Sequence, residues 1–123
     1  MQQRRLKDFN MVSDEALVAK LVFQGCINPI VENGFLVDCK SVPETLIIPR
    51  GIIGLCLGCL SGQTELVTVK FPSTLQYIQG FPLSNCINLK NIYIPIELKK
   101  FGSQLSFANE ARIIYVYSDK EIK

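Results

Sequence analysis

The segment Leu46-Ile47-Ile48-Pro49 recurs in form as Val69-Lys70-Phe71-Pro72 and again as Ile92-Tyr93-Ile94-Pro95. The three prolines keep a constant 23-residue spacing, and each one closes a short run in which alternate positions are apolar. A period of two is typical of a β-strand that buries every second side chain. A constant longer period of this kind indicates stacked repeat units rather than a globule of unrelated elements.

Apolar residues keep the same spacing on both sides of the prolines. Leu46 aligns with Val69 and Ile92, and two further columns are apolar in all three units: Ile52, Leu75 and Leu98, then Leu55, Ile78 and Phe101. We therefore expect parallel strands, about 4.8 Å apart, whose inward side chains stack from unit to unit. Because proline has no backbone N–H, each proline is expected to end the hydrogen-bonded ladder.

One unit resembles a known family. The segment Leu89-Lys90-Asn91-Ile92-Tyr93-Ile94-Pro95-Ile96-Glu97-Leu98-Lys99-Lys100-Phe101-Gly102 is similar to the 23-residue leucine-rich repeat of the BspA type, which runs L-x-x-I-x-I-P-x-x-L-x-x-I-G, then Ala-Phe and Cys. Residues 66–88 match best, with Phe81 and Cys86 near the expected Phe and Cys. The resemblance implies a β-rich repeat solenoid with parallel strands on one face. Members of this family mostly serve as binding surfaces, many of them on the cell surfaces of bacteria.

The length suits one domain, in which we distinguish four parts. Residues 1–28 are interpreted as an N-terminal tail and helix, residues 29–43 as a hairpin cap, residues 44–111 as three repeats, and residues 112–123 as a C-terminal capping strand and tail. Caps are expected because an open solenoid end exposes the core and an unpaired strand edge.

The N-terminal helix is predicted over residues 14–24. Ser13 is a suitable N-cap, Asp14 and Glu15 suit the first turn, and Gly25 follows the helix end. The apolar stripe would consist of Leu17, Val18, Leu21 and Val22. Residues 1–10 are expected to be frayed.

A hairpin and a final strand are predicted at the two ends of the repeats. Asn33-Gly34 lies between apolar runs and predicts a type I′ turn in a hairpin over residues 29–40. Residues 113–117 form a strand whose register stays open: the 23-residue period turns Tyr115 and Tyr117 inward and Ile114 and Val116 outward, and a one-residue slip reverses this. The tail 119–123 is polar and expected to be exposed.

Composition limits the classes of protein to consider. Apolar residues are 48% and charged residues 20%, so the chain is expected to fold unaided. The net charge of +2 does not by itself indicate nucleic acid or membrane as a partner, and no apolar run is long enough to span a bilayer. The N-terminus does not resemble a secretory signal. We expect a cytoplasmic protein, or a secreted or surface one if the native start is missing.

Cysteine and histidine usage argues against an enzyme. The five cysteines are an odd number and indicate free thiols in a reducing compartment, most of them buried. Histidine is absent, which removes Ser-His-Asp and Cys-His catalysis and His-ligated zinc. We therefore expect no catalytic residues, no metal site and no cofactor.

The outward positions of the strands are the candidate binding site. Two columns follow from the period: Thr45, Thr68, Asn91 and Ile114, and beside them Ile47, Lys70, Tyr93 and Val116. Tyr93 with Lys70 and Ile47 has the character of a binding hot spot. We expect the partner to be another protein, with this chain acting as an adaptor or inhibitor, although a solvated face without a partner is the simpler alternative.

Two other functions stay open. The apolar edge strand at residues 113–117 could mediate self-assembly into a structural homo-oligomer. Cys56-Leu57-Gly58-Cys59 is a C-x-x-C that could serve redox or metal chemistry, although packing within the repeat accounts for it more simply. Nucleic acid is not expected: Lys90, Lys99 and Lys100 are read as solvated lysines, and Gly51, Gly54 and Gly58 lack the context of a phosphate loop.

Overall fold

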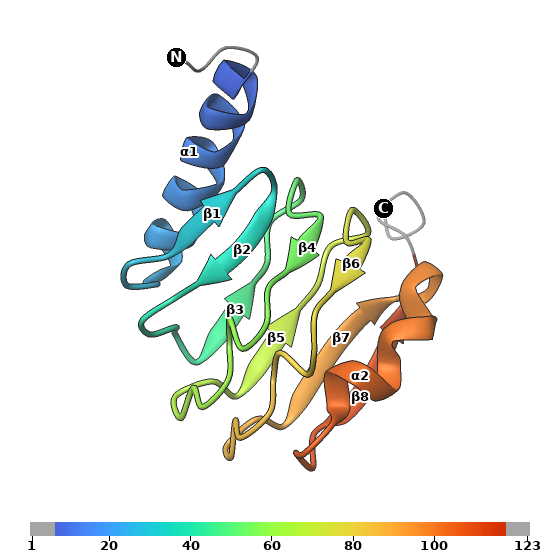
Figure 1. Ribbon diagram of the computed structural model, residues 1–123. Helices are drawn as coiled ribbons and strands as arrows, with labels where there is room; N and C mark the ends of the chain where they lie inside the picture. Colours follow the sequence, from blue (N-terminus) through green and yellow to red (C-terminus); the bar gives the residue numbers. More distant parts are fainter. Residues whose placement is uncertain (1–6, 118–123) are drawn as a thin grey trace.

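The computed structural model describes residues 7–117. A long N-terminal helix precedes two sheets, and two short helices lie before the last strand (Figure 1). Helix α1 (Lys7–Gln24) precedes the hairpin strands β1 (Ile30–Glu32) and β2 (Phe35–Asp38). The other elements follow in chain order: β3 (Thr45–Ile47), β4 (Gly54–Leu55), β5 (Thr68–Lys70), β6 (Tyr77–Ile78), β7 (Asn91–Pro95), the 3-10 helix η1 (Ile96–Phe101), α2 (Gly102–Ser106) and β8 (Arg112–Val116). In this part of the chain the strands form the sheets β1-β2-β4-β6 and β3-β5-β7-β8.

The parallel sheet of β3, β5 and β7 confirms the predicted repeat register. Leu46 pairs with Val69 and Val69 with Ile92, so each partner occupies the equivalent position of the next repeat. All three side chains are 0% exposed. Burying a side chain of this size contributes roughly 1.5–3 kcal/mol, so this inward column is a main source of stability. The columns beyond the prolines also reach the core, with Ile52, Leu75 and Leu98 buried.

The second sheet was not predicted. Strands β4 and β6 are only two residues long, and they extend the hairpin in parallel by pairing Leu36 with Leu55 and Leu55 with Ile78. A run of two residues is too short for alternation to reveal. Gly54 has a steric role here, because a Cβ at this position would lie 2.2 Å from the Phe35 ring. That ring stacks on Tyr77 at a centroid distance of 5.7 Å, on the side of the sheet away from Leu55.

Helix α1 begins earlier than predicted. Its first residue is Lys7, so Ser13 lies within the helix and is not its N-cap, and residues 7–10 are helical rather than frayed. A local cap preference of about 1 kcal/mol does not interrupt a helix whose hydrogen bonds continue through it. The end is as predicted, since Gly25 follows Gln24 with a φ of +109°. Residues 1–6 and the predicted polar tail, residues 119–123, lie outside the described residues.

The apolar stripe of α1 is only partly buried. Leu17 and Leu21 lie in the core and Val18 packs against it, whereas Val22 is half-exposed. Asp14 binds the hairpin instead of serving the first helical turn: its carboxylate accepts hydrogen bonds from the backbone N–H of Asn33 at 2.6 Å and of Gly34 at 3.1 Å. Both turn residues have positive φ, as the predicted type I′ turn requires.

The last strand pairs in a register that differs from both predicted alternatives. Ile92 pairs with Ile113, whereas a full repeat period would have paired it with Tyr115. The pairing of β8 is thus shifted by two residues from the repeat period. An even shift keeps Tyr115 on the inward side, paired with Ile94, so the alternative with a one-residue slip is wrong. Tyr115 is nevertheless 41% exposed, because the described chain places no further strand beyond it. Pro95 pairs with Val116, so the ladder continues through this proline, contrary to prediction.

Replacement of Ile92 by alanine tests the inward column. We expect Ile92→Ala to lower the free energy of unfolding by about 2–5 kcal/mol, because the cavity would lie between two packed strands. Glu65→Ala, at an exposed position, should change it by less than about 0.5 kcal/mol. Urea denaturation followed by circular dichroism measures both, and equal effects of the two substitutions would contradict the register.

Candidate functional site

The outward side chains of β3, β5, β7 and β8 form one surface, here named the strand face. Its first column contains Thr45, Thr68 and Asn91, as predicted, but its fourth member is Arg112. The Asn91 side-chain amide donates to the Thr68 hydroxyl at 3.3 Å, and Arg112 Nε donates to Asn91 Oδ1 at 3.1 Å. The placement of Ile114 in this column was wrong, because the connection through η1 and α2 is two residues shorter than the repeat.

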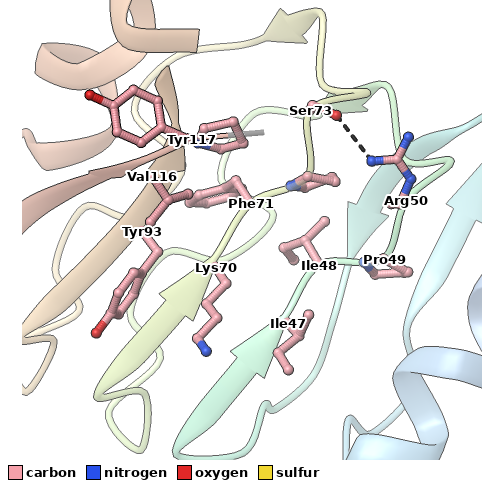
Figure 2. A pocket seen from close by; sticks show the side chains of 12 residues that line it. Ile47, Ile48, Pro49, Arg50, Lys70, Phe71, Ser73, Tyr93, Val116 and Tyr117 are labelled. Carbon is pink, nitrogen blue, oxygen red and sulfur yellow. Dashed lines mark hydrogen bonds between the residues drawn. The ribbon is translucent and has the colours of Figure 1, made fainter. Parts of the chain in front are cut away.

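The second column runs from Ile47 through Lys70 and Tyr93 to Ile114. Ile114 therefore takes the position predicted for Val116, which pairs with Pro95 at the rim of the face. The Lys70 ammonium lies 5.2 Å from the centroid of the Tyr93 ring, within cation–π distance. Ile47 is 49% exposed, which is unusual for a large aliphatic side chain in a strand. The predicted trio of Ile47, Lys70 and Tyr93 is thus brought together (Figure 2).

A hollow of about 380 Å³ lies beside this column, where the strands end. We name it the strand-end hollow; its lining residues are Ile47, Ile48, Pro49, Arg50, Lys70, Phe71, Pro72, Ser73, Tyr93, Pro95, Val116 and Tyr117. Arg50 Nη1 donates a hydrogen bond to the Ser73 hydroxyl at 3.1 Å, which joins the loops that follow β3 and β5 (Figure 2). Apolar walls with a few polar groups are typical of a recognition site.

Part of this hollow was missed at the sequence level. The prolines were read only as strand ends, although all three line the hollow. Arg50 and Ser73 occupy equivalent positions, each directly after a repeat proline, so the repeat spacing held a signal for the contact between them. Tyr117 had no such signal, because the changed register of β8 decides its place.

The free edge of β3 is closed by a side chain of α1. Gln24 Nε2 donates to the Ile47 carbonyl at 2.6 Å, and the Ile47 N–H donates to Gln24 Oε1 at 2.8 Å. The amide thereby replaces the peptide group of a neighbouring strand at an otherwise unpaired edge. On the second sheet, Gln104 of α2 similarly donates to the carbonyls of Ile78 and Gly80.

Of the two C-x-x-C thiols, Cys59 packs in the core, whereas Cys56 is partly exposed. Cys59 is 1% exposed, and burial raises its pKa from the ordinary 9.0 to about 12. Such a thiol stays protonated at neutral pH and is a poor nucleophile or metal ligand. The five cysteines are unpaired. Between residues 7 and 117, thiol and carboxylate side chains form no group of three or more that could hold a metal ion.

The lysines considered for phosphate binding do not belong to the two columns of the strand face. Lys90 borders a different hollow, together with Glu110 and the strand-face residue Arg112, so charges of both signs meet there. Lys99 and Lys100 belong to η1, and the Lys100 ammonium lies 5.3 Å from the Phe101 ring.

Comparison with known families matches residues 29–123 to the BspA type leucine rich repeat region, in six copies. The chain therefore belongs to the BspA-type leucine-rich-repeat family. Domains of this kind are typically non-catalytic and generally bind other proteins.

Two further comparisons gave no match, one with curated proteins and one with solved structures. Across residues 7–117, no helix has both the length and the apolar character that crossing a bilayer requires.

Substitution of Gln24 tests the closed edge. Gln24→Glu keeps the shape of the side chain but removes the donor to the Ile47 carbonyl, so the free energy of unfolding should fall by about 1–3 kcal/mol. Amide exchange at Ile47 should accelerate selectively, which NMR detects. Gln76→Ala, at an exposed position, is the matched control. Unchanged exchange at Ile47 would show that the edge does not depend on this amide.

The buried thiol predicts a loss of stability in alkali. Between pH 9 and 12 the unfolded chain releases the Cys59 proton while the folded chain retains it, so the free energy of unfolding falls as pH rises. From pH 9 to about 10.5, wild-type protein should lose about 1.5 kcal/mol more than Cys59→Ala does. Parallel pH profiles for wild type and Cys59→Ala, measured by urea denaturation, would refute this assignment.

Proposed function

We propose that the repeats form a short solenoid, closed at its N-terminal end by α1 and the hairpin, that binds another protein through the strand face. The proposal is carried by one observation: the outward columns meet in register beside an apolar hollow. Helix α1 packs against β1, and Gln24 occupies the edge of β3, which supports the capping role. The chain would act as an adaptor or inhibitor by covering a surface of its partner.

The composition of the strand face favours protein over other ligands. It combines a tyrosine, a lysine and an isoleucine on rigid strands, and the tyrosine supplies a large contact area at a small cost in side-chain entropy. The polar column of Thr45, which is exposed, and of Thr68 and Asn91, which are half-buried, lies beside them and would supply a rim of hydrogen-bonding groups. Family membership supports the same function, because leucine-rich-repeat domains generally bind proteins.

Two substitutions on the strand face test this function. Tyr93→Ala and Lys70→Glu should each weaken partner binding by at least roughly tenfold, as expected for central residues of an interface. Thermal unfolding should stay close to wild type, because both side chains point away from the core. The partner would be isolated with the intact domain from a lysate of the source cells and its affinity measured by biolayer interferometry.

The matched control is Lys40→Glu, which makes the same change of charge at an exposed position outside the strand face. Partner affinities that are unchanged in both strand-face variants would remove this surface from consideration.

Self-assembly is a second candidate function, favoured by one observation. In the described chain no strand covers the outer side of β8, whereas Gln24 covers the outer side of β3. An uncovered edge is a template for pairing with another copy. Sedimentation velocity separates the candidates: a dimer whose population rises with concentration supports self-assembly, and a monomer at every concentration argues against it.

A further inference from the structure

A second hollow beside α1 adjoins the strand-end hollow. This helix-side hollow measures about 440 Å³ and is lined by Ala19, Lys20, Phe23, Gln24, Ile47 and Pro49. Because Ile47 and Pro49 line both hollows, the two are neighbours, and together they are named the groove, which runs from α1 along the strand ends toward Tyr117. Its walls expose large apolar side chains, with Phe23 93% exposed and Tyr117 67% exposed.

The charges along this groove all have one sign. Lys20, Arg50 and Lys70 line it, and no Asp or Glu does so among residues 7–117. The whole chain has nearly equal numbers of basic and acidic residues, 13 and 11, so the excess is local. Surfaces of one charge select partners of the opposite charge and exclude those of the same charge. The groove therefore favours an anionic partner with apolar side chains.

The direction of the groove indicates how such a partner would lie. The groove crosses the strands, whose backbone groups are already paired within the sheet, so side chains must carry the recognition. Strands about 4.8 Å apart place β3 and β8 about 14 Å from each other, a distance that about four to five extended residues span at about 3.3 Å each.

We propose that the groove binds an extended acidic segment of the partner protein. Its carboxylates pair with Lys20 and Lys70, and its apolar side chains pack against Phe23, Ile47 and Tyr117. Tyr93, whose ring centroid lies 5.2 Å from the Lys70 ammonium, adds a phenolic hydroxyl that can donate to a carboxylate. This inference rests on the proposed function, because it names the kind of partner that the strand face would take.

Selection from a library of random heptapeptides displayed on phage tests the proposal with the intact protein. The expected result is enrichment of peptides with net negative charge and at least one large apolar residue. The affinity of an enriched synthetic peptide, measured by fluorescence anisotropy, should fall roughly tenfold in Lys70→Glu and further in the double variant Lys20→Glu/Lys70→Glu. It should also fall as sodium chloride is raised from 50 to 500 mM, because salt screens such pairs (about 14 Å to 4 Å Debye length).

The control variant is Lys40→Glu/Lys99→Glu, which makes the same change in net charge at positions that line neither hollow. It should bind the peptide like the wild type. The proposal of an acidic segment would be overturned by any of three results: enrichment of neutral or basic peptides, no enrichment, or an equal loss of affinity in the control variant. A free protein that dimerises, and stops doing so in Lys70→Glu, would also overturn it and assign the groove to a second copy.

These outcomes separate the inference from the proposed function. If neutral or basic peptides are enriched and their binding is lost in Tyr93→Ala, the strand face remains a binding site. Only its preference for acidic peptides is then refuted. Enriched peptides that bind Tyr93→Ala and Lys70→Glu as well as wild type would count against both.

Discussion

The inward column of Leu46, Val69, Ile92 and Ile113 determines how the strands of the main sheet lie relative to one another. Because side chains alternate along a strand, a one-residue slip of β5 would turn Lys70 into the core and Val69 into water. An unpaired buried ammonium is far more costly than any contact that the slip could gain. The described core contains no buried polar or charged side chain, so apolar stacking holds this register from the inside, and hydrogen bonds such as that from Asn91 to Thr68 link the repeats on the outside.

The surface follows from the same constraint. Once the inward residues are in line, Ile47, Lys70 and Tyr93 must be neighbours on the opposite side, and the prolines that follow them must line one hollow. The edge strands of the sheet need other hydrogen-bond partners for their unpaired backbone groups. At the edge of β3, the side-chain amide of Gln24 takes the place of the peptide group of a further strand. The backbone of Ile47 is therefore paired, and its side chain stays accessible.

The spacing of the sequence predicted the elements that recur in each repeat, and it missed the elements that depend on non-repeating contacts. The 23-residue period predicted the parallel sheet with its inward and outward sides. The Asn33-Gly34 pair, a strong local signal, predicted the hairpin turn. Strands β4 and β6 were missed because two residues show no alternation. The register of β8 depends on how η1 and α2 pack, so Arg112 could not be assigned to the strand face from the period. Helix α1 extends past Ser13 because continued helical hydrogen bonds outweigh one cap residue.

The register itself is open to direct measurement by NMR. In protein with labelled methyl groups, the account predicts nuclear Overhauser contacts from Leu46 to Val69, from Val69 to Ile92 and from Ile92 to Ile113. It predicts none from Leu46 to Ile92, which are two strands and about 10 Å apart. Methyl contacts that link Val69 to neither Leu46 nor Ile92 would contradict the stacking, and the strand face would lose its basis.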